Sequence, residues 1–150
     1  MTIESSAFQH NGKIPLLYTC DGEGVTPPLR VGGIPKDAQS IVLIVDDPDA
    51  PGGTFDHWVM WNIPVVASDM KGGETPQGVV GENSLAQNNY VPLCPPIGQH
   101  RYFFKVYALD ILLDLPPSSC KTAIVQAMEG HVLDFAEMIG LYQRGRGVIR

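Results

Sequence analysis

The chain has 150 residues, long enough for a full hydrophobic core, and we expect a single domain over residues 1–150. Hydrophobic residues make up 44% of the sequence and charged residues 17%, which excludes an intrinsically disordered chain. The formal net charge of −6 argues against a broad nucleic-acid-binding surface. The 16 glycines and 13 prolines favour a β protein rich in turns.

We expect a cytoplasmic protein without a membrane span. Residues 1–6 lack the basic and apolar regions of a signal peptide, and no apolar run approaches the roughly 18–20 residues that cross a bilayer. Cys20, Cys94 and Cys120 are not in CxxC spacing, so a reduced state is the simplest interpretation. A bond between Cys20 and Cys94 stays open, because the sequence does not show whether the two residues meet.

The first third of the chain is predicted to be extended. Asn11-Gly12 interrupts short apolar stretches in residues 3–19, which indicates a hairpin or a tight turn. The apolar run 41–45 predicts a strand that is buried on both faces. This strand ends in three carboxylates, those of Asp46, Asp47 and Asp49. Pro48 and Pro51 keep the acidic segment out of a helix.

His57 comes directly before the next predicted strand, residues 58–63. Trp58 and Trp61 lie within that strand, so we interpret them as core residues. The segment 67–98 is rich in Gly, Pro and Asn and predicts a long loop. A loop of this length in a compact domain is usually functional when it is ordered; a plain surface loop is the alternative.

Residues 100–110 are rich in aromatic and branched side chains and predict another strand. Period-two alternation places one set of side chains on a single face, namely His100, Tyr102, Phe104, Val106 and Ala108.

A helix is predicted after Pro116-Pro117. Ser118 or Ser119 can cap it, Lys121 begins it and Gly130 kinks it. Helical spacing of apolar residues then continues to Gly140, through Val132, Phe135, Ala136 and Ile139. The chain ends in a basic stretch with Arg144, Arg146 and Arg150.

The acidic segment and His57 suggest a binding pocket. A carboxylate of Asp47 or Asp49 that accepts from one ring nitrogen of His57 would orient the imidazole and favour its protonated form. His100 and Tyr102 would add donors, together with backbone amides of the loop 95–98, so that an anion could bind. A structural hydrogen bond is the alternative role for each histidine, and more so for His10 and His131. Asp46 and Asp56 are interpreted as turn or surface acids.

Two enzymatic alternatives have weaker signals. Two histidines and an aspartate could hold a metal, but no HxH, HxxxH or HExxH spacing is present. A serine hydrolase would need a nucleophile elbow, and Ser84 does not lie in a GxSxG sequence. We therefore expect no metal and no cofactor.

Several motifs, in this order and spacing, resemble those of the phosphatidylethanolamine-binding protein (PEBP) family, also called the Raf kinase inhibitor protein family. The bacterial and archaeal branch is the closer match, over about residues 3–144. The matching segments are Tyr18-Thr19-Cys20-Asp21-Gly22, Asp47-Pro48-Asp49-Ala50-Pro51, residues 57–64, Cys94-Pro95-Pro96, Gly98-Gln99-His100-Arg101-Tyr102, residues 107–110 and residues 130–133.

The resemblance implies a mainly β fold, a sandwich of two antiparallel sheets with short helices near the C-terminus. It also implies a small anion-binding pocket at one end of the sandwich. The residues that it assigns to this pocket are Asp47, Asp49, His57, Pro96, His100, Tyr102 and, at the rim, Tyr142. It makes Ala50–Pro51 a candidate cis peptide. Tyr90-Val91-Pro92-Leu93 departs from the Gly-Gly-Pro of relatives, and its bulk could narrow the mouth of the pocket.

The expected function is binding of a small anion or a phospholipid head group: phosphate, phosphoethanolamine or a carboxylate. By family analogy the protein could regulate a kinase or a protease partner, and a homodimer is left open. The alternative is a small hydrolase or a metal-dependent enzyme that uses His57 and His100. A further alternative is an interaction protein that meets its partner through the loop 67–98.

Overall fold

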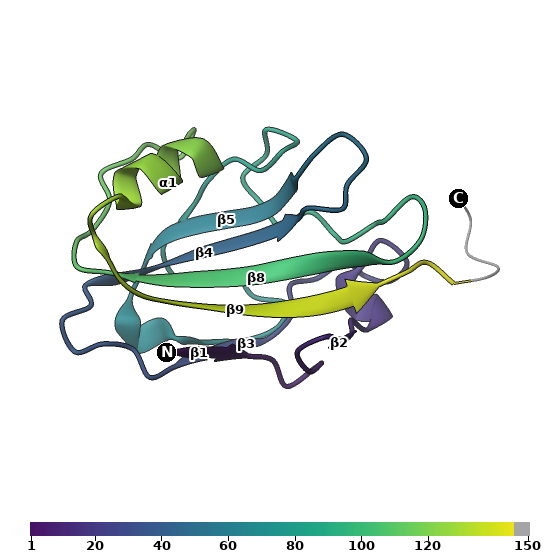
Figure 1. Cartoon of the computed structure of the whole chain (residues 1–150), viewed down its shortest axis with the longest axis horizontal. Helices are drawn as coiled ribbons and strands as arrows, with labels where there is room; N and C mark the ends of the chain where they lie inside the picture. The colour runs from purple at the N-terminus through teal and green to yellow at the C-terminus, as the bar shows by residue number, and fades with distance from the viewer. Residues whose placement is uncertain (146–150) are drawn as a thin grey trace.

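The computed structural model describes residues 1–145 as a sandwich of two β-sheets (Figure 1), so Arg146 and Arg150 lie outside the described residues. The smaller sheet has three strands in the order β1-β3-β6, and the larger sheet has six in the order β2-β9-β8-β4-β5-β7. The strands are β1 (Thr2–Glu4), β2 (Gly12–Lys13), β3 (Leu29–Gly32), β4 (Ser40–Asp47), β5 (Phe55–Ile63), β6 (Asp69–Met70), β7 (Val79–Val80), β8 (His100–Leu109) and β9 (Val132–Tyr142).

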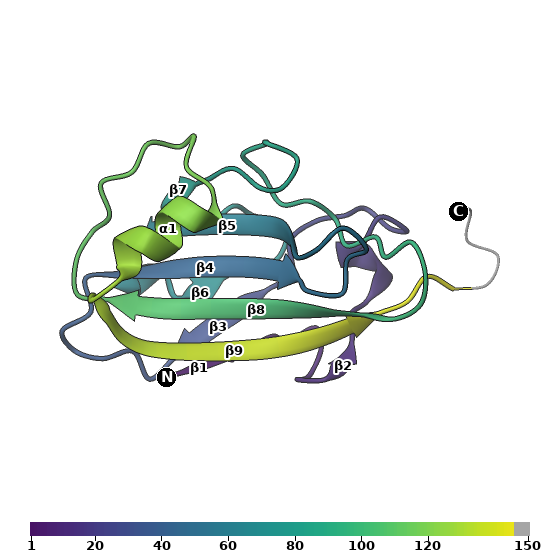
Figure 2. The same cartoon turned by 45° about the horizontal axis from the view of Figure 1, so that its top comes forward.

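The predicted fold class is confirmed, with two differences of detail. All strand pairs are antiparallel except β2 and β9, which run parallel. Within residues 1–145 the only α-helix is α1 (Lys121–Met128), beside two short 3₁₀ segments, Leu16–Tyr18 and Val65–Ala67. Figure 2 shows α1 above the larger sheet, near β5.

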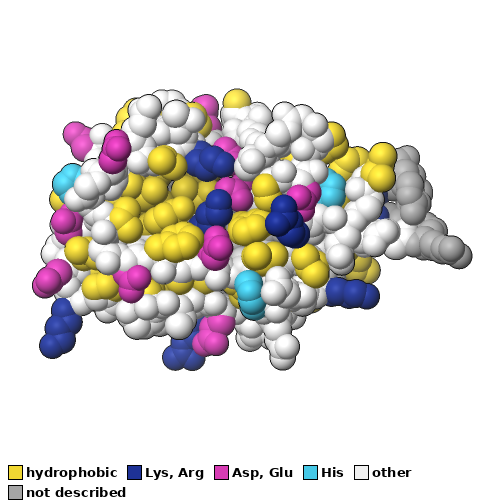
Figure 3. Space-filling view, in the orientation of Figure 1, with side chains coloured by type: hydrophobic (Ala, Val, Ile, Leu, Met, Phe, Trp, Pro, Cys, Tyr) yellow, Lys and Arg dark blue, Asp and Glu magenta, His cyan; other side chains and the backbone are white. Residues whose placement is uncertain are grey.

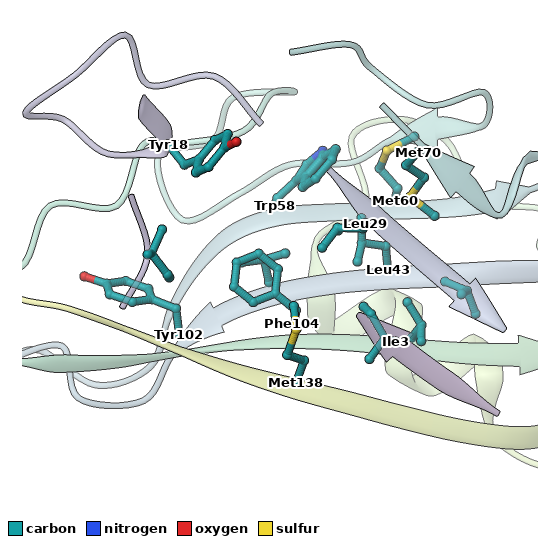
Figure 4. Packing of buried hydrophobic residues seen from close by; sticks show 14 of the residues in the cluster. Ile3, Tyr18, Leu29, Leu43, Trp58, Met60, Met70, Tyr102, Phe104 and Met138 are labelled. Atoms are coloured by element: carbon teal, nitrogen blue, oxygen red, sulfur yellow. The ribbon is translucent and has the colours of Figure 1, made fainter. Parts of the chain in front are cut away.

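The main core lies between the two sheets. Ile3, Leu29 and Met70 from the smaller sheet pack against residues of the larger sheet such as Trp58 and Phe104 (Figure 4). β4 is buried along its whole length because α1 covers its other face. This second core contains Val42, Ile44, Trp61, Ile124 and Met128. The predicted strands 41–45, 58–63 and 100–110 and the core positions of both tryptophans are confirmed.

The predicted helix beyond Gly130 is wrong. Residues Val132–Tyr142 form β9, which pairs with β8 from Leu109↔Val132 to His100↔Tyr142. Ala136, Met138 and Tyr142 face the main core, whereas Phe135 and Val132 are exposed. Both faces of this segment carry apolar residues, so its sequence fits a helix and a strand alike. Backbone hydrogen bonds to β8 decide for the strand.

Of four smaller expectations, the turn at Asn11-Gly12 is confirmed and the other three are wrong. Asn11-Gly12 makes a tight turn in which Gly12 N–H donates to Gln9 O, but no hairpin, since β2 pairs with β9 instead. Cys120 is the N-cap of α1, and no side chain caps that helix end. Gly130 has φ 80° and follows the helix rather than kinking it. All peptide bonds between residues 1 and 145 are trans, including Ala50–Pro51.

Cys20 and Cys94 form a disulfide with an S–S distance of 2.01 Å, so the expected reduced state is wrong for this pair. Cys120 is free and exposed. In the described part of the chain, no helix has the length and apolar character needed to cross a membrane.

Candidate functional site

A small cavity lies where the C-terminal end of β4 meets the N-terminal ends of β5 and β8. Antiparallel pairing brings these three ends together, because Asp47 lies opposite Phe55 and Asp46 lies opposite Phe103. The cavity has a volume of about 190 Å³, and its lining is Asp47, Ala50, Pro51, Phe55, His57, Val91, Pro92, Cys94, Pro96, His100 and Tyr102. Most of its surface is apolar, with polar groups supplied by Asp47, two histidines and a tyrosine.

A β-bulge directs His57 into this cavity. Val45 pairs with Trp58 and Asp46 pairs with Asp56, so His57 is an extra residue with no partner on β4. Regular alternation would send His57 and Trp58 to opposite faces of the sheet. The bulge lets Trp58 enter the main core while the adjacent His57 ring packs against Tyr102, with ring centroids 5.5 Å apart.

Asp47 and His100 form a buried pair of a carboxylate and an imidazole. His100 Nδ1 donates to Asp47 Oδ2 over 2.6 Å, and both side chains are almost fully buried. Asp47 Oδ1 also accepts from the Asp49 N–H at 2.8 Å. These two contacts fix the His100 ring and leave its Nε2 without a protein partner among residues 1–145.

His57 is held by a backbone carbonyl rather than by a carboxylate. Its Nδ1 lies 2.8 Å from Val91 O, in the loop that follows β7. Burial lowers the pKa of His57 below its ordinary value of 6.5, although the Val91 carbonyl and the carboxylates of Asp47, Asp56 and Asp46 act in the opposite direction. The expectation that an aspartate holds His57 in its protonated form is therefore wrong.

Tyr102 contributes a hydroxyl group with no hydrogen-bond partner in the described structure. The side chain is fully buried, lies on the same face of β8 as His100, and lines the cavity. Burial, assisted by the Asp47 carboxylate, raises the pKa of Tyr102 well above its ordinary value of 10.0. The hydroxyl thus keeps its hydrogen, and a molecule in the cavity can satisfy it.

Two residues that the resemblance assigned to the pocket do not line the cavity. The Asp49 carboxylate turns outward to Arg101, with Oδ1 2.8 Å from Nη2 and Oδ2 2.9 Å from Nε. The Arg101 side chain lowers the pKa of Asp49 to about 2. Tyr142 donates its hydroxyl hydrogen to Asp21, which also binds Arg144. Asp49 therefore binds a residue of β8 and Tyr142 binds Asp21, and neither side chain belongs to the cavity wall.

The long segment 67–98 supplies one side of the cavity. Val91 and Pro92 line it, so the departure from Gly-Gly-Pro places bulk in the wall. Leu93 is fully buried and accepts the N–H of Cys20. Of the loop 95–98, only Pro96 reaches the lining, so the expected backbone amides of that loop do not face the cavity.

Four lining residues were not predicted from the sequence as pocket residues: Ala50, Pro51, Phe55 and Cys94. Ala50, Pro51 and Cys94 belong to motifs that carried the resemblance, which was the available signal for them. Phe55 had only its nearness to His57. Apolar wall residues otherwise have no local pattern that separates them from core residues.

Asp46 and Asp56 are not surface acids. Asp46 is buried on the other face of β4, where it binds Lys105 Nζ at 3.0 Å and Lys121 Nζ at 3.3 Å. Lys121 Nζ also binds Asp56 Oδ1 at 2.6 Å. The space-filling view shows such adjacent basic and acidic side chains amid hydrophobic ones on this face (Figure 3). The group is a charge network that neutralises itself.

The remaining histidines lie away from the cavity. His10 Nδ1 accepts the N–H of Ile139, and His131 Nδ1 lies 2.8 Å from Asp110 Oδ1 in an exposed pair. His131 follows α1 rather than lying within it. No group of three or more His, Cys, Asp or Glu side chains is arranged as a metal site in the described range.

The fold and the cavity define a two-sheet β-sandwich with a small pocket, lined by two histidines and a tyrosine, at one end of the larger sheet. The family model described as phosphatidylethanolamine-binding protein matches residues 4–143. The chain belongs to the phosphatidylethanolamine-binding protein family, as its motifs suggested.

Named relatives support this assignment. A UPF0098 protein of Methanothermobacter thermautotrophicus is 48% identical over 151 residues, which cover 97% of this chain and 100% of that protein. One from Archaeoglobus fulgidus is 44% identical over 94% of this chain, which spans 50% of that longer protein.

Two solved structures share the fold. CT736 from Chlamydia trachomatis, described as a homologue of phosphatidylethanolamine-binding protein, has a TM-score of 0.94 and 38% identity, with 96% of this chain and 97% of that chain covered. YbcL from E. coli, described as a member of the mammalian PEBP family, has a TM-score of 0.88 and 24% identity over 96% of this chain and 98% of that chain. The second likeness is one of fold alone.

Proposed function

We propose that the protein binds a small oxyanion, borne by a phosphate or carboxylate head group, in the cavity between His57, His100 and Tyr102. The observation that carries this proposal is the buried pair of His100 and Asp47. A buried carboxylate at Nδ1 offsets the positive charge of a protonated imidazole, and the free Nε2–H then points to a ligand as a charged donor.

The hydroxyl of Tyr102 supports the same proposal. It is fully buried and unpaired within residues 1–145, and an unsatisfied polar group of this kind costs about 1–3 kcal/mol. An anion that accepts from both Tyr102 and His100 removes that cost. The apolar wall, which includes Phe55, Val91 and Pro96, excludes water and strengthens these hydrogen bonds.

The size of the cavity limits the ligand. About 190 Å³ admits a phosphate or a short head group, whereas the chains of a phospholipid would have to remain outside. The name of the family concerns a phospholipid head group; for this chain a phosphate or carboxylate group alone is proposed as the buried portion of the ligand.

Binding of inorganic phosphate and of phosphoethanolamine, measured by isothermal titration calorimetry, tests the proposal. His100→Ala is expected to weaken binding at least about tenfold, because a charge-assisted hydrogen bond of about 1.5–3 kcal/mol is lost. His131→Ala is a matched control, since it removes a histidine that also binds an aspartate but lies on the exposed surface. Equal affinities in all three proteins, or no binding by the unmodified protein, would contradict the proposal.

A further inference from the structure

The tautomer of His57 sets what the cavity can recognise. A carbonyl oxygen has no hydrogen to give, so the 2.8 Å contact with Val91 O places the hydrogen on Nδ1. In a neutral ring, Nε2 is then a lone-pair acceptor. This atom has no protein partner in the described structure, and the side chain lines the cavity. His57 therefore offers an acceptor, whereas Tyr102 and, under the proposed function, His100 offer donors.

An ordinary oxyanion fits only the donors. Its oxygens accept hydrogen bonds, so an oxygen placed against Nε2 of neutral His57 would face another lone pair. An oxyanion that keeps one acidic hydrogen fits all three groups, because its O–H donates to Nε2 while its other oxygens accept from Tyr102 and His100. A phosphomonoester in its monoanionic form has such a hydrogen, and a phosphodiester or a carboxylate has none.

We propose that His57 makes the cavity selective for phosphomonoester monoanions over phosphodiesters of the same size and charge, by accepting a hydrogen bond from the P–OH group. The inference deepens the proposed function and rests on it. It assigns His57 as the residue that determines specificity and His100 with Tyr102 as the residues that bind any oxyanion.

The groups that surround His57 agree with a neutral ring. The carboxylates of Asp47, Asp56 and Asp46 favour its protonated form, but burial outweighs them and lowers the pKa. The other groups facing it in the cavity are Tyr102, whose pKa is raised, and the His100 ring. If His57 did become protonated at low pH, Nε2 would turn into a donor and the selectivity would disappear.

The same chemistry could come from a soluble phosphomonoester or from a lipid that ends in one, such as phosphatidic acid. The formal net charge of −6 disfavours approach to an anionic membrane, so a soluble monoester is the expected source.

The decisive experiment uses two constitutional isomers, ethyl phosphate and dimethyl phosphate. They have the same atoms, but only the monoanion of ethyl phosphate has a P–OH group. Because the second pKa of a phosphomonoester is about 6, about half of the ethyl phosphate is this monoanion near pH 6, so the two affinities are compared per monoanion. Calorimetric titration at about pH 6 is expected to show dimethyl phosphate binding about tenfold to a hundredfold more weakly, the effect of an unpaired buried acceptor.

A pH series on the unmodified protein gives a second measurement. The affinity for ethyl phosphate divided by the affinity for dimethyl phosphate should fall as the pH rises from about 6 to 8, because ethyl phosphate loses the hydrogen of its P–OH group in this range. Dimethyl phosphate does not titrate there, so its affinity reports any change that comes from the protein rather than from the ligand. An affinity ratio that stays constant across this range would overturn the inference.

A variant locates the effect. Glutamine carries both a donor and an acceptor and can turn its amide, so His57→Gln should bind the two isomers about equally. Its folding is checked by thermal unfolding, and the isomer comparison on the unmodified protein keeps the test independent of this variant. Retained discrimination in a folded His57→Gln protein would overturn the assignment to His57.

The outcomes separate the two proposals. If both isomers bind equally to the unmodified protein, the selectivity is wrong while oxyanion binding stands; if neither isomer nor inorganic phosphate binds, both are wrong. Sedimentation with phosphatidylcholine vesicles, with and without phosphatidic acid, distinguishes the source. If the protein binds ethyl phosphate but no vesicles, a soluble monoester is supported. If it binds vesicles only when they contain phosphatidic acid, a lipid monoester is supported and the expectation of a soluble one is overturned.

Discussion

Asp46 and Asp47 are neighbours on β4, yet their carboxylates lie on opposite faces of the larger sheet in different chemical surroundings. Asp46 lies beneath the start of α1 and binds Lys105 and Lys121. Asp47 lies on the side of the main core and binds His100, whose second ring nitrogen is free at the cavity. The exposed fractions of the two residues are almost the same, 1% and 3%.

The difference shows what separates a structural charge from one that can serve a ligand. Around Asp46 the acidic and basic side chains pair with one another. Burial acts to lower the pKa of Lys121, but Asp56 and Asp46 raise it above its ordinary 10.5. The partner of Asp47 is the imidazole of His100, which has two nitrogens, so one nitrogen can bind the protein while the other binds a ligand. Burial alone does not distinguish the two sites.

The largest expected effect comes from Asp47→Ala. This change leaves the His100 ring and the Asp49 N–H without their acceptor, and two unsatisfied donors cost about 2–5 kcal/mol of unfolding free energy. Urea denaturation measures the loss, and calorimetry should show phosphate affinity reduced at least about tenfold. Unchanged phosphate binding in the folded variant would remove the distinction between Asp46 and Asp47.

Asp46→Ala should lower the free energy of unfolding less than Asp47→Ala does, and it should leave ligand binding unchanged. Lys105 loses its carboxylate, but both lysine side chains are about a quarter exposed, at 27% and 26%, and Lys121 keeps Asp56. We expect a loss of about 1–2 kcal/mol of unfolding free energy by urea denaturation, with phosphate affinity unchanged. A large loss of affinity would show that the two faces of β4 are coupled.

The pH dependence of stability sharpens the description of the cavity. The pKa of His57 is lower in the folded protein than its ordinary 6.5, so the unfolded chain takes up a proton first as the pH falls. Above about pH 6.5, His57 is neutral in both the folded and the unfolded protein and does not lower the free energy of unfolding. As the pH falls from 6.5 toward the pKa of His57 in the folded protein, the free energy of unfolding decreases by at most about 1.4 kcal/mol per pH unit. Urea denaturation between pH 7 and 5 should show a smaller loss for His57→Gln than for the unmodified protein, and identical slopes would contradict the lowered pKa.

The smallest effect is expected for His131→Ala. His131 and Asp110 repeat the pairing of His100 with Asp47 at the opposite end of β8, but their side chains are 40% and 42% exposed. Solvent screens such a pair, so unfolding free energy should change by no more than about 0.5 kcal/mol, and phosphate affinity should stay the same. A loss as large as that of Asp47→Ala would show that burial is not what distinguishes the two pairs.

Much of the fold could be predicted because its signals are local. The apolar run 41–45 and the aromatic run 100–110 can be buried only as strands between turn-rich segments, and both are strands. Alternation placed His100 and Tyr102 on one face of β8, and both line the cavity. The motifs gave the family, and with it the two-sheet architecture.

Three features of the site needed the tertiary structure. β9 is a strand because β8 offers it hydrogen-bond partners, although its own apolar spacing fits a helix equally well. The bulge in β5 turns His57 to the cavity, against the regular alternation of a strand. Which carboxylate meets which histidine depends on this geometry, so that Asp47 binds His100 while Asp49 turns to Arg101.

By itself, then, the sequence determined the main strands, the side chains that share a face, and the family. The tertiary structure decided the last strand, the direction of His57 and the partner of each carboxylate. The physical reason is range: periodicity and turn chemistry act between residues a few positions apart. Strand pairing, bulges and ion pairs instead join residues of different elements, such as Asp46 and Asp56 at the bulge or Asp47 and His100, which are 53 positions apart.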